Sequence, residues 1–284
     1  MKHLNPIRGY YAGSLLLAFA LVHQDLQAQH VHVNAGAYST AQGAQLYFPN
    51  GDAYDSNASY DVYLSFTNSG AFSNLYQGAG VTFTALASTP DNGGPAFGHA
   101  ADGAFLQLQF VSISGPPGGV LGVWMQNPAS PGGNDLLFTL PVGVNSGTNL
   151  LALSESDGSP GSDPYGHIHG RTFTATQPGL YTLGCRILDT SNNGEGGGPI
   201  HAPSALYYFY FQAGLTISSW SKDSDGFAIT FGTATGKDYY VESTPDLTAT
   251  NWTTFAGPIT GDNYLHVATT NPPETKLFFR VRSN

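Results

Sequence analysis

The chain has 284 residues, of which 41% are hydrophobic and only 10% charged, and its formal net charge is −10. No lysine or arginine occurs between Gly9 and Gly170. Proteins that bind nucleic acid or anionic lipid need basic surfaces, so the charge pattern argues against both as partners. Glycine (36 residues), proline (18 residues) and aromatic residues (13%) are plentiful, and no segment keeps a 3.6-residue apolar period over three turns. The composition therefore predicts an all-β protein with many short strands joined by turns.

The first 28 residues have the features of a secretory signal peptide. Lys2 and Arg8 form a basic start, residues 12–22 are apolar, and Leu26-Gln27-Ala28 offers a cleavage site. The apolar run is too short to span a membrane, and no later run is long enough. We therefore expect an exported protein whose mature chain begins at Gln29 and has no transmembrane segment. Its expected location is the periplasm, the cell surface or the extracellular space.

Residues 29–214 carry a series of strand patterns with turn signals every 8 to 15 residues. This spacing predicts a two-sheet β-sandwich, Ig-like or jelly-roll-like. Around Phe110 the apolar residues change faces, so that end of the strand is either buried on both sides or interrupted by a bulge. In chain order, strands are expected at 30–34, 45–48, 60–66, 80–86, 103–113, 119–125, 135–140, 149–154, 166–176, 180–188 and 205–212.

Residues 215–284 form a second predicted unit, a fibronectin-like β module of about 70 residues, which is within the usual size of a domain. It has five basic and seven acidic residues, and its one histidine is His266. Asp225-Gly226 and Thr235-Gly236-Lys237 are turn signals between its strands. Its strands are expected at 215–220, 227–231, 239–243, 253–255, 265–268 and 277–281.

The stretch 166–184, GHIHGRTFTATQPGLYTLG, carries two histidines at the start of a strand that turns back at Gln177-Pro178-Gly179. Successive side chains of a strand point to opposite faces, so His167 and His169 should share a face, with Cα atoms roughly 6.5–7 Å apart. Two such imidazoles can bind one metal ion at about 2.0–2.1 Å each. His30 and His32 form a second pair of the same kind. We expect the two pairs to meet around one ion.

A site made of histidines, with or without one carboxylate, favours Zn²⁺, with Cu²⁺ as the alternative, over Mg²⁺ or Ca²⁺. Asp163, four residues before His167, could bind the ion or accept a hydrogen bond from an imidazole N–H. The alternative explanation for one pair is a polar edge on a strand that faces solvent. The candidate metal ligands are His30, His32, His99, His167, His169 and His201.

The sequence favours a binding protein over an enzyme, and no catalytic residues are predicted. Neither a G-x-S-x-G nor an H-E-x-x-H motif occurs. The single cysteine, Cys185, alternates with Leu183 and Ile187 on one face and is expected to be a buried apolar residue, not a ligand. A surface adhesion or carbohydrate-binding protein is an alternative, in which the aromatic run at 207–211 supplies stacking faces.

A copper oxidase or polysaccharide monooxygenase-like enzyme is a further alternative, in which the N-terminal amine and histidine hold copper. It requires cleavage directly before His30, whereas Ala28 is the better cleavage residue.

Residues 167–187, HIHGRTFTATQPGLYTLGCRI, together with the aromatic strand that ends at Gly214, resemble a repeat of bacterial choice-of-anchor and other surface-anchored exported proteins. The pattern there is roughly H-x-H, an aromatic residue, then F-T-x-x-G-x-Y-x-L. The resemblance covers most of residues 30–214 and is strong over about 25 of them. Such proteins are often associated with zinc or manganese uptake loci, which implies zinc binding and a partner at the cell surface or in metal uptake. This chain has Gly170-Arg171-Thr172 where the family often has Asn-Trp, and it lacks a sorting tail.

The second unit resembles a small β module that ends many exported proteins of Verrucomicrobia-type bacteria. The pattern there is Y-x-V-E-x-S-x-D-L, then W, then F-x-R-V. It is matched here by residues 239–247, by Trp252 and by Phe278-Phe279-Arg280-Val281. The resemblance implies an accessory or surface-display role.

These observations together predict an exported metal-binding protein that scavenges or presents zinc. Its partners are expected to be the metal ion and either cell-surface or metal-uptake components or glycans.

Overall fold

The computed structural model describes residues 31–49, 61–86, 98–224, 226–248, 250–262, 265–271 and 277–284. The predicted signal peptide and His30 lie outside these residues. The prediction of an all-β protein is confirmed, because 55% of the chain is strand and no helix among the described residues has seven or more residues. No helix that is described is long and apolar enough to cross a membrane.

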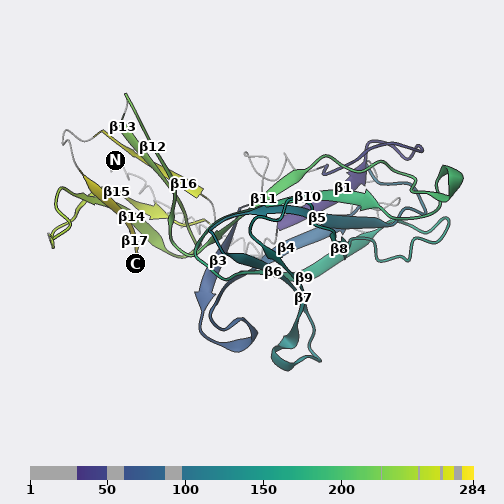
Figure 1. The fold of residues 1–284 in the computed structure, drawn as a ribbon, viewed down its shortest axis with the longest axis horizontal. Coiled ribbons are helices and arrows are strands. Elements are labelled where there is room, and N and C mark those ends of the chain that lie inside the picture. Colours follow the sequence, from purple (N-terminus) through teal and green to yellow (C-terminus); the bar gives the residue numbers. More distant parts are fainter. Residues whose placement is uncertain are drawn as a thin grey trace, which may run out of the picture.

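A large mixed sheet and two small antiparallel sheets make up the fold. In Figure 1 the large sheet lies at one end of the molecule, and the small sheets lie at the other. The strands are β1 (Val31–Ala37), β2 (Leu46–Tyr47), β3 (Asp61–Thr67), β4 (Leu75–Ala85), β5 (Leu106–Ser114), β6 (Val120–Gln126), β7 (Asn134–Pro141), β8 (Asn149–Ala152), β9 (Gly166–Ala175), β10 (Gly179–Asp189), β11 (Tyr207–Ala213), β12 (Ile217–Asp223), β13 (Gly226–Gly232), β14 (Asp238–Thr244), β15 (Thr253–Thr260), β16 (Leu265–Thr270) and β17 (Phe278–Ser283). Short 3-10 turns lie at η1 (Gly70–Phe72), η3 (Pro131–Gly133) and η4 (Glu195–Gly197).

The large sheet has the strand order β7-β6-β9-β4-β3-β11-β10-β5-β8, and β1 pairs with β4 and β2 beside this path. Two of its pairings are parallel, β1 with β4 and β3 with β11. β3 is shared by the two halves of this sheet, because its first residues, 61–64, pair with β11 and its last residues, 65–67, pair with β4. The arrangement is that of a β-sandwich. Aromatic rings meet across the interior, with Phe83 6.0 Å from Phe209 and Phe173 4.6 Å from Phe211 between ring centroids.

Strict alternation of apolar residues builds this core. On β10, Leu183, Cys185 and Ile187 are all at most 1% exposed, which confirms the expected burial of the cysteine. Burial also raises the pKa of the Cys185 thiol well above its ordinary value. Where β5 meets β10, Cys185 pairs with Phe110 and Gly184 pairs with Ser112. Val111, which lies between Phe110 and Ser112, therefore has no pairing partner on β10. This β-bulge explains the change of face that the sequence shows after Phe110.

The two small sheets, β12-β13-β16 and β15-β14-β17, enclose a second apolar core around Phe231, Tyr239 and Val241. This core contacts the large sheet through a hydrogen bond between the hydroxyl groups of Tyr63 and Tyr239. Burial and the neighbouring Tyr239 raise the pKa of Tyr63 to about 12. A Cβ atom at Gly232 would overlap the buried side chain of Gln212, so the module packs closely against β11.

Glu242 on β14 is the polar centre of the C-terminal module. Its side chain is buried, and its carboxylate accepts hydrogen bonds from Arg280 Nε at 2.7 Å and Arg282 Nε at 3.2 Å. The Arg280 guanidinium lies over the ring of Trp252, with 4.3 Å to the centroid. Burial by itself raises the pKa of Glu242, but the hydrogen bonds and charges of the two arginines outweigh it, so the pKa is lower than usual. The Glu, Trp and Arg of the C-terminal sequence pattern thus form one structural cluster.

This cluster makes the stability of the C-terminal module dependent on pH. Because the pKa of Glu242 is lower in the folded than in the unfolded chain, its contribution is complete above about pH 4.3–4.5 and is lost as pH falls further. We expect Glu242→Gln to reduce the free energy of unfolding by about 1–3 kcal/mol at pH 7 and to remove part of the acid sensitivity. Calorimetric unfolding from pH 7 to pH 3 tests this, with the exposed carboxylate variant Glu195→Gln as control. An equal loss in both variants would contradict the assignment.

Candidate metal centre

The two His-x-His segments lie on strands that flank the same neighbour. β4 pairs in parallel with β1 through Val31–Ala35 of β1, and antiparallel with β9 along its other edge. Residues that are more than 130 positions apart in the sequence are therefore two strands apart in the sheet. Adjacent strands lie about 4.7–4.9 Å apart, so the backbones of β1 and β9 are roughly 10 Å apart.

The pairing register aligns the histidine positions row by row. His167 pairs with Thr84, and Thr84 pairs on its other side with Asn34. His32 pairs with Thr82, which is the next residue of β4 on the same face as Thr84. The register between β4 and β9 shifts near Val81, next to position 169. The His32 and His167 positions therefore lie on opposite sides of β4 and are offset by two residues along the strand direction.

These rows lie on the outer face of the sandwich. The row between them consists of Val33, Phe83 and Ile168 and points into the core. Thr82 and Thr84 are nevertheless only 2% exposed, so this part of the outer face is shielded from solvent. Electrostatic interactions are stronger at such a shielded surface than they are in bulk water.

His167 itself is half-buried, and its Nε2 atom is shielded from solvent. Its backbone N–H donates to Glu155 Oε1 at 3.0 Å. The backbone N–H of Glu155 in turn donates to the carbonyl of Tyr165 at 2.8 Å, so the acidic loop runs alongside the start of β9. A Cβ atom at Gly166 would overlap the carbonyl oxygen of Leu153, which explains the glycine before the histidine pair.

Two carboxylates lie near the start of β9, and each accepts a hydrogen bond from a different backbone N–H group. Asp163, predicted either to bind the ion or to accept a hydrogen bond from an imidazole N–H, accepts a hydrogen bond from the backbone N–H of Tyr165 at 3.0 Å and shapes the loop before the strand. Glu155 makes the contact with His167. No sequence pattern singles out Glu155, because its contact with His167, twelve residues later, depends on the fold of the loop between them.

His99 and His201 lie elsewhere. The backbone N–H of Ala37, at the end of β1, donates to the carbonyl of Gly98 at 2.8 Å. His99 is thus near the opposite end of β1 from His32, five residues or roughly 16 Å along the strand. The Nδ1 atom of His99 lies 2.8 Å from the carbonyl oxygen of Ala100.

His201 is only 2% exposed, and both of its ring nitrogens bond the backbone. Nε2 accepts a hydrogen bond from the N–H of Ala101 at 2.9 Å, and Nδ1 donates to the carbonyl of Ala44 at 3.1 Å. An N–H group can only donate and a carbonyl can only accept, so these partners fix the neutral tautomer. The lone pair that a metal would need is engaged, and His201 functions here as a link between two loops.

A buried carboxylate completes this link. Asp189 is 6% exposed and accepts four backbone N–H bonds: from Phe105 and Ser191 at Oδ1, and from Ile200 and His201 at Oδ2. The four distances lie between 2.8 and 3.1 Å. Burial lowers the pKa of His201, and its bond to Ala44 and the charge of Asp189 oppose this shift. The imidazole therefore stays neutral in the folded protein at neutral pH.

The side chains of His99, His167 and His201 are described, whereas only the backbones of His32 and His169 are. Among the described side chains, no group of three or more His, Cys, Asp or Glu residues could hold a metal ion. A shared site is therefore supported by the strand register and not by described side-chain contacts.

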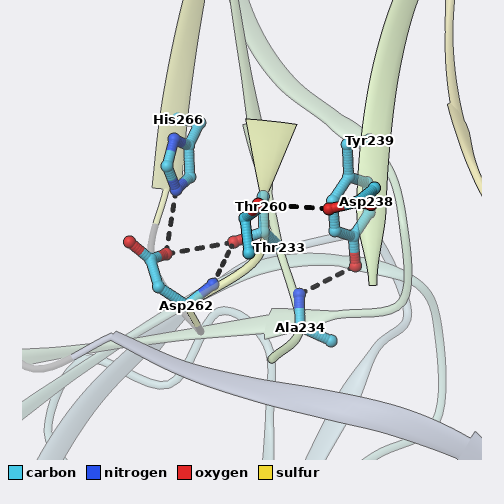
Figure 2. Close-up of polar contacts among 7 residues, drawn as sticks. All are labelled: Thr233, Ala234, Asp238, Tyr239, Thr260, Asp262 and His266. Carbon is cyan, nitrogen blue, oxygen red and sulfur yellow. Dashed lines mark hydrogen bonds and ion pairs between the residues drawn. The ribbon is translucent and has the colours of Figure 1, made fainter. Parts of the chain in front are cut away.

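The C-terminal module contains a separate histidine–carboxylate contact, shown in Figure 2. His266 Nε2 lies 2.8 Å from Asp262 Oδ1, which also accepts from Thr233 Oγ1 at 3.2 Å. The N–H of Asp262 donates back to Thr233 Oγ1 at 3.2 Å. Thr233 is fully buried, and Asp262 contacts both Thr233 and His266. The Thr233 hydroxyl is therefore not arranged as a nucleophile beside a base. This network links Asp262, which follows the end of β15, to His266 on β16 and to Thr233, which follows β13.

Comparison with known proteins adds no assignment: no family model matches the sequence, and no curated protein matches it.

The structural role of His201 gives a direct prediction. His201→Ala would leave the Ala101 N–H without its partner and would remove one of the two hydrogen bonds of the Ala44 carbonyl, which also accepts from the Ala202 N–H at 3.1 Å. We expect it to lower the free energy of unfolding by about 1–3 kcal/mol at pH 7.5. Chemical denaturation measures this, with His99→Ala as the matched control.

The pKa direction adds a pH test. A histidine with a lowered folded pKa stabilises fully above its unfolded pKa of about 6.5, and this contribution falls as pH falls toward the folded value. The difference between wild type and His201→Ala should therefore shrink below about pH 6.5. A difference that grows on acidification would contradict the neutral, buried imidazole.

Proposed function

We propose that this protein is an exported zinc-binding protein that scavenges or presents the metal. In this proposal His32, His167 and His169 bind the ion on the outer face of β1, β4 and β9. Three histidines leave the fourth position of tetrahedral zinc open for water or a receiving partner. His30, which lies outside the described residues, is a candidate fourth ligand.

One observation carries the proposal: both His-x-His segments flank β4, with His32 beside Thr82 and His167 beside Thr84. The two segments are far apart in the sequence, yet they lie on the two strands that flank β4, and the His32 and His167 positions are offset by only two residues along the strands. The His32 and His167 positions are roughly 10 Å apart across the strands and roughly 6.5–7 Å apart along them, or about 12 Å in all. Two imidazole side chains that extend toward each other can close this span, each binding the ion at about 2.0–2.1 Å.

The charge of the first unit supports a cation as ligand. Residues 29–214 contain eleven acidic residues and two basic ones, Arg171 and Arg186. A surplus of negative charge raises the local concentration of cations and speeds their encounter with the protein. Nitrogen donors suit copper as well as zinc, so the identity of the metal is an outcome of the test.

We expect protein purified without a histidine tag to contain close to one zinc ion per chain, measured by inductively coupled plasma mass spectrometry. The double variant His167→Ala/His169→Ala should lose it, because two of three ligands are removed. His99→Ala and His266→Ala are the matched controls and should keep the metal. A wild type that contains no metal and takes up none on titration at neutral pH would contradict the proposal.

The contribution of β1 needs its own test. His32→Ala should weaken zinc binding by more than the roughly 10- to 100-fold that loss of a supporting residue usually costs. Competition with a chromophoric chelator measures this affinity, and circular dichroism confirms that each variant keeps its strand content. Unchanged affinity in His32→Ala would limit the site to β9.

A further inference from the structure

An open groove lies where β2 and the start of β11 meet, away from the proposed metal site. Its volume is about 400 Å³, within the range of about 300–1,000 Å³ that is usual for small-molecule sites. Tyr38, which lines it, follows the end of β1, whereas His32 lies near the beginning of that strand. Its ten lining residues include Tyr38, Gln45, Tyr47, Phe48, Ser204 and Tyr207.

An exposed aromatic ring forms one wall of the groove. The rings of Tyr38 and Tyr47 are stacked, with centroids 4.2 Å apart and planes within 10° of parallel. Tyr38 is still 68% exposed. Because Tyr47 covers one face of the Tyr38 ring, the other face must supply much of this exposed area. The stack restricts the rotamers of Tyr38, so little additional side-chain entropy is lost when a ligand packs on the ring.

Hydrogen bonds and a ring contact connect the residues that line the groove to the rest of the fold. The N–H of Tyr38 donates to the carbonyl of Gln45 at 3.1 Å, and the N–H of Leu46 donates to the carbonyl of Ala202 at 2.9 Å. Ser204 Oγ accepts from the N–H of Ile187 and donates to the carbonyl of Ala205, both at 2.8 Å. Phe48 packs on Tyr207 with 4.8 Å between ring centroids. A groove held in this way is formed before a ligand arrives.

The chemistry of the lining selects the class of ligand. None of its ten residues is an acid, a base or a histidine. A charged ligand would lose its hydration here without gaining an opposite charge, which costs free energy. A purely apolar ligand would cover the exposed polar side chains of Gln45 and Tyr38 without offering them hydrogen bonds. A neutral sugar offers both an apolar C–H face for the ring and hydroxyl groups for these partners.

We propose that this groove binds a neutral carbohydrate, with Tyr38 as the stacking face and Gln45 as a hydrogen-bonding side chain. The aromatic run at 207–211, expected to supply stacking faces, contributes only Tyr207 to the groove. Phe209 and Phe211 are 1% exposed and belong to the core. The inference is independent of the metal proposal, because no histidine lines the groove.

The test is binding to an array of neutral glycans in the presence of a chelator, followed by calorimetric titration of the full chain with the best-bound disaccharide. Tyr38→Ala should weaken binding by roughly tenfold or more, and Tyr38→Trp should retain it. The matched control is Tyr208→Ala, which removes an exposed tyrosine outside the groove lining. Because Tyr38 is exposed, its loss should leave the fold intact, which circular dichroism checks.

Three outcomes would overturn the inference. These are no binding of any neutral glycan at millimolar concentration, unchanged affinity in Tyr38→Ala, or an equal loss in Tyr208→Ala. Binding that disappears with the chelator but is unaffected by Tyr38→Ala would also overturn it and would place sugar recognition at a metal.

Discussion

The pairing of β4 with three other strands is the constraint on which the first unit depends. Its first half pairs with β3 and its second half with β1, while β9 follows it along the opposite edge. Val81, Phe83 and Ala85 point into the core, and Thr82 and Thr84 point outward between β1 and β9. A one-residue slip would reverse every one of these side chains, so burial of Phe83 and its neighbours also fixes which residues flank the histidine positions.

At the other end of β1, a polar link serves a different purpose. Asp189 accepts four backbone N–H bonds, and His201 joins the loops of Ala44 and Ala101. Buried backbone groups need partners, and these two side chains supply them where no strand does. The link also supports the groove, because Ala202, next to His201, accepts the hydrogen bond from Leu46. Histidines in this protein therefore have at least two roles, and their number alone does not define a site.

Local patterns predicted most of the fold. Period-2 alternation located the strands, and the change of face after Phe110 corresponds to a bulge opposite Gly184 and Cys185. The burial of Cys185 followed from its neighbours Leu183 and Ile187 in the same way. The expectation that His167 and His169 share a face rests on an unbroken strand period, whereas the register between β4 and β9 shifts beside position 169.

Contacts between distant segments could not be predicted in this way. The parallel pairing of β1 with β4 leaves no local signal, because it depends on the core of the whole sandwich. His201 was a candidate ligand because it follows a glycine-rich loop, and only the fold shows its ring between two backbone groups. Tyr38 and Tyr207, which line one groove, are 169 residues apart in the sequence. The aromatic run at β11 was the stronger local signal and lies largely in the core.

The measurement that tests the central claim most directly is anomalous diffraction at the zinc absorption edge from crystals of the full chain grown with one equivalent of zinc. The account predicts a single strong peak on the outer face of β1, β4 and β9, about 2.0–2.1 Å from imidazole nitrogens of His32, His167 and His169. A peak at His99, at His201 or between Asp262 and His266, or no peak at all, would contradict it.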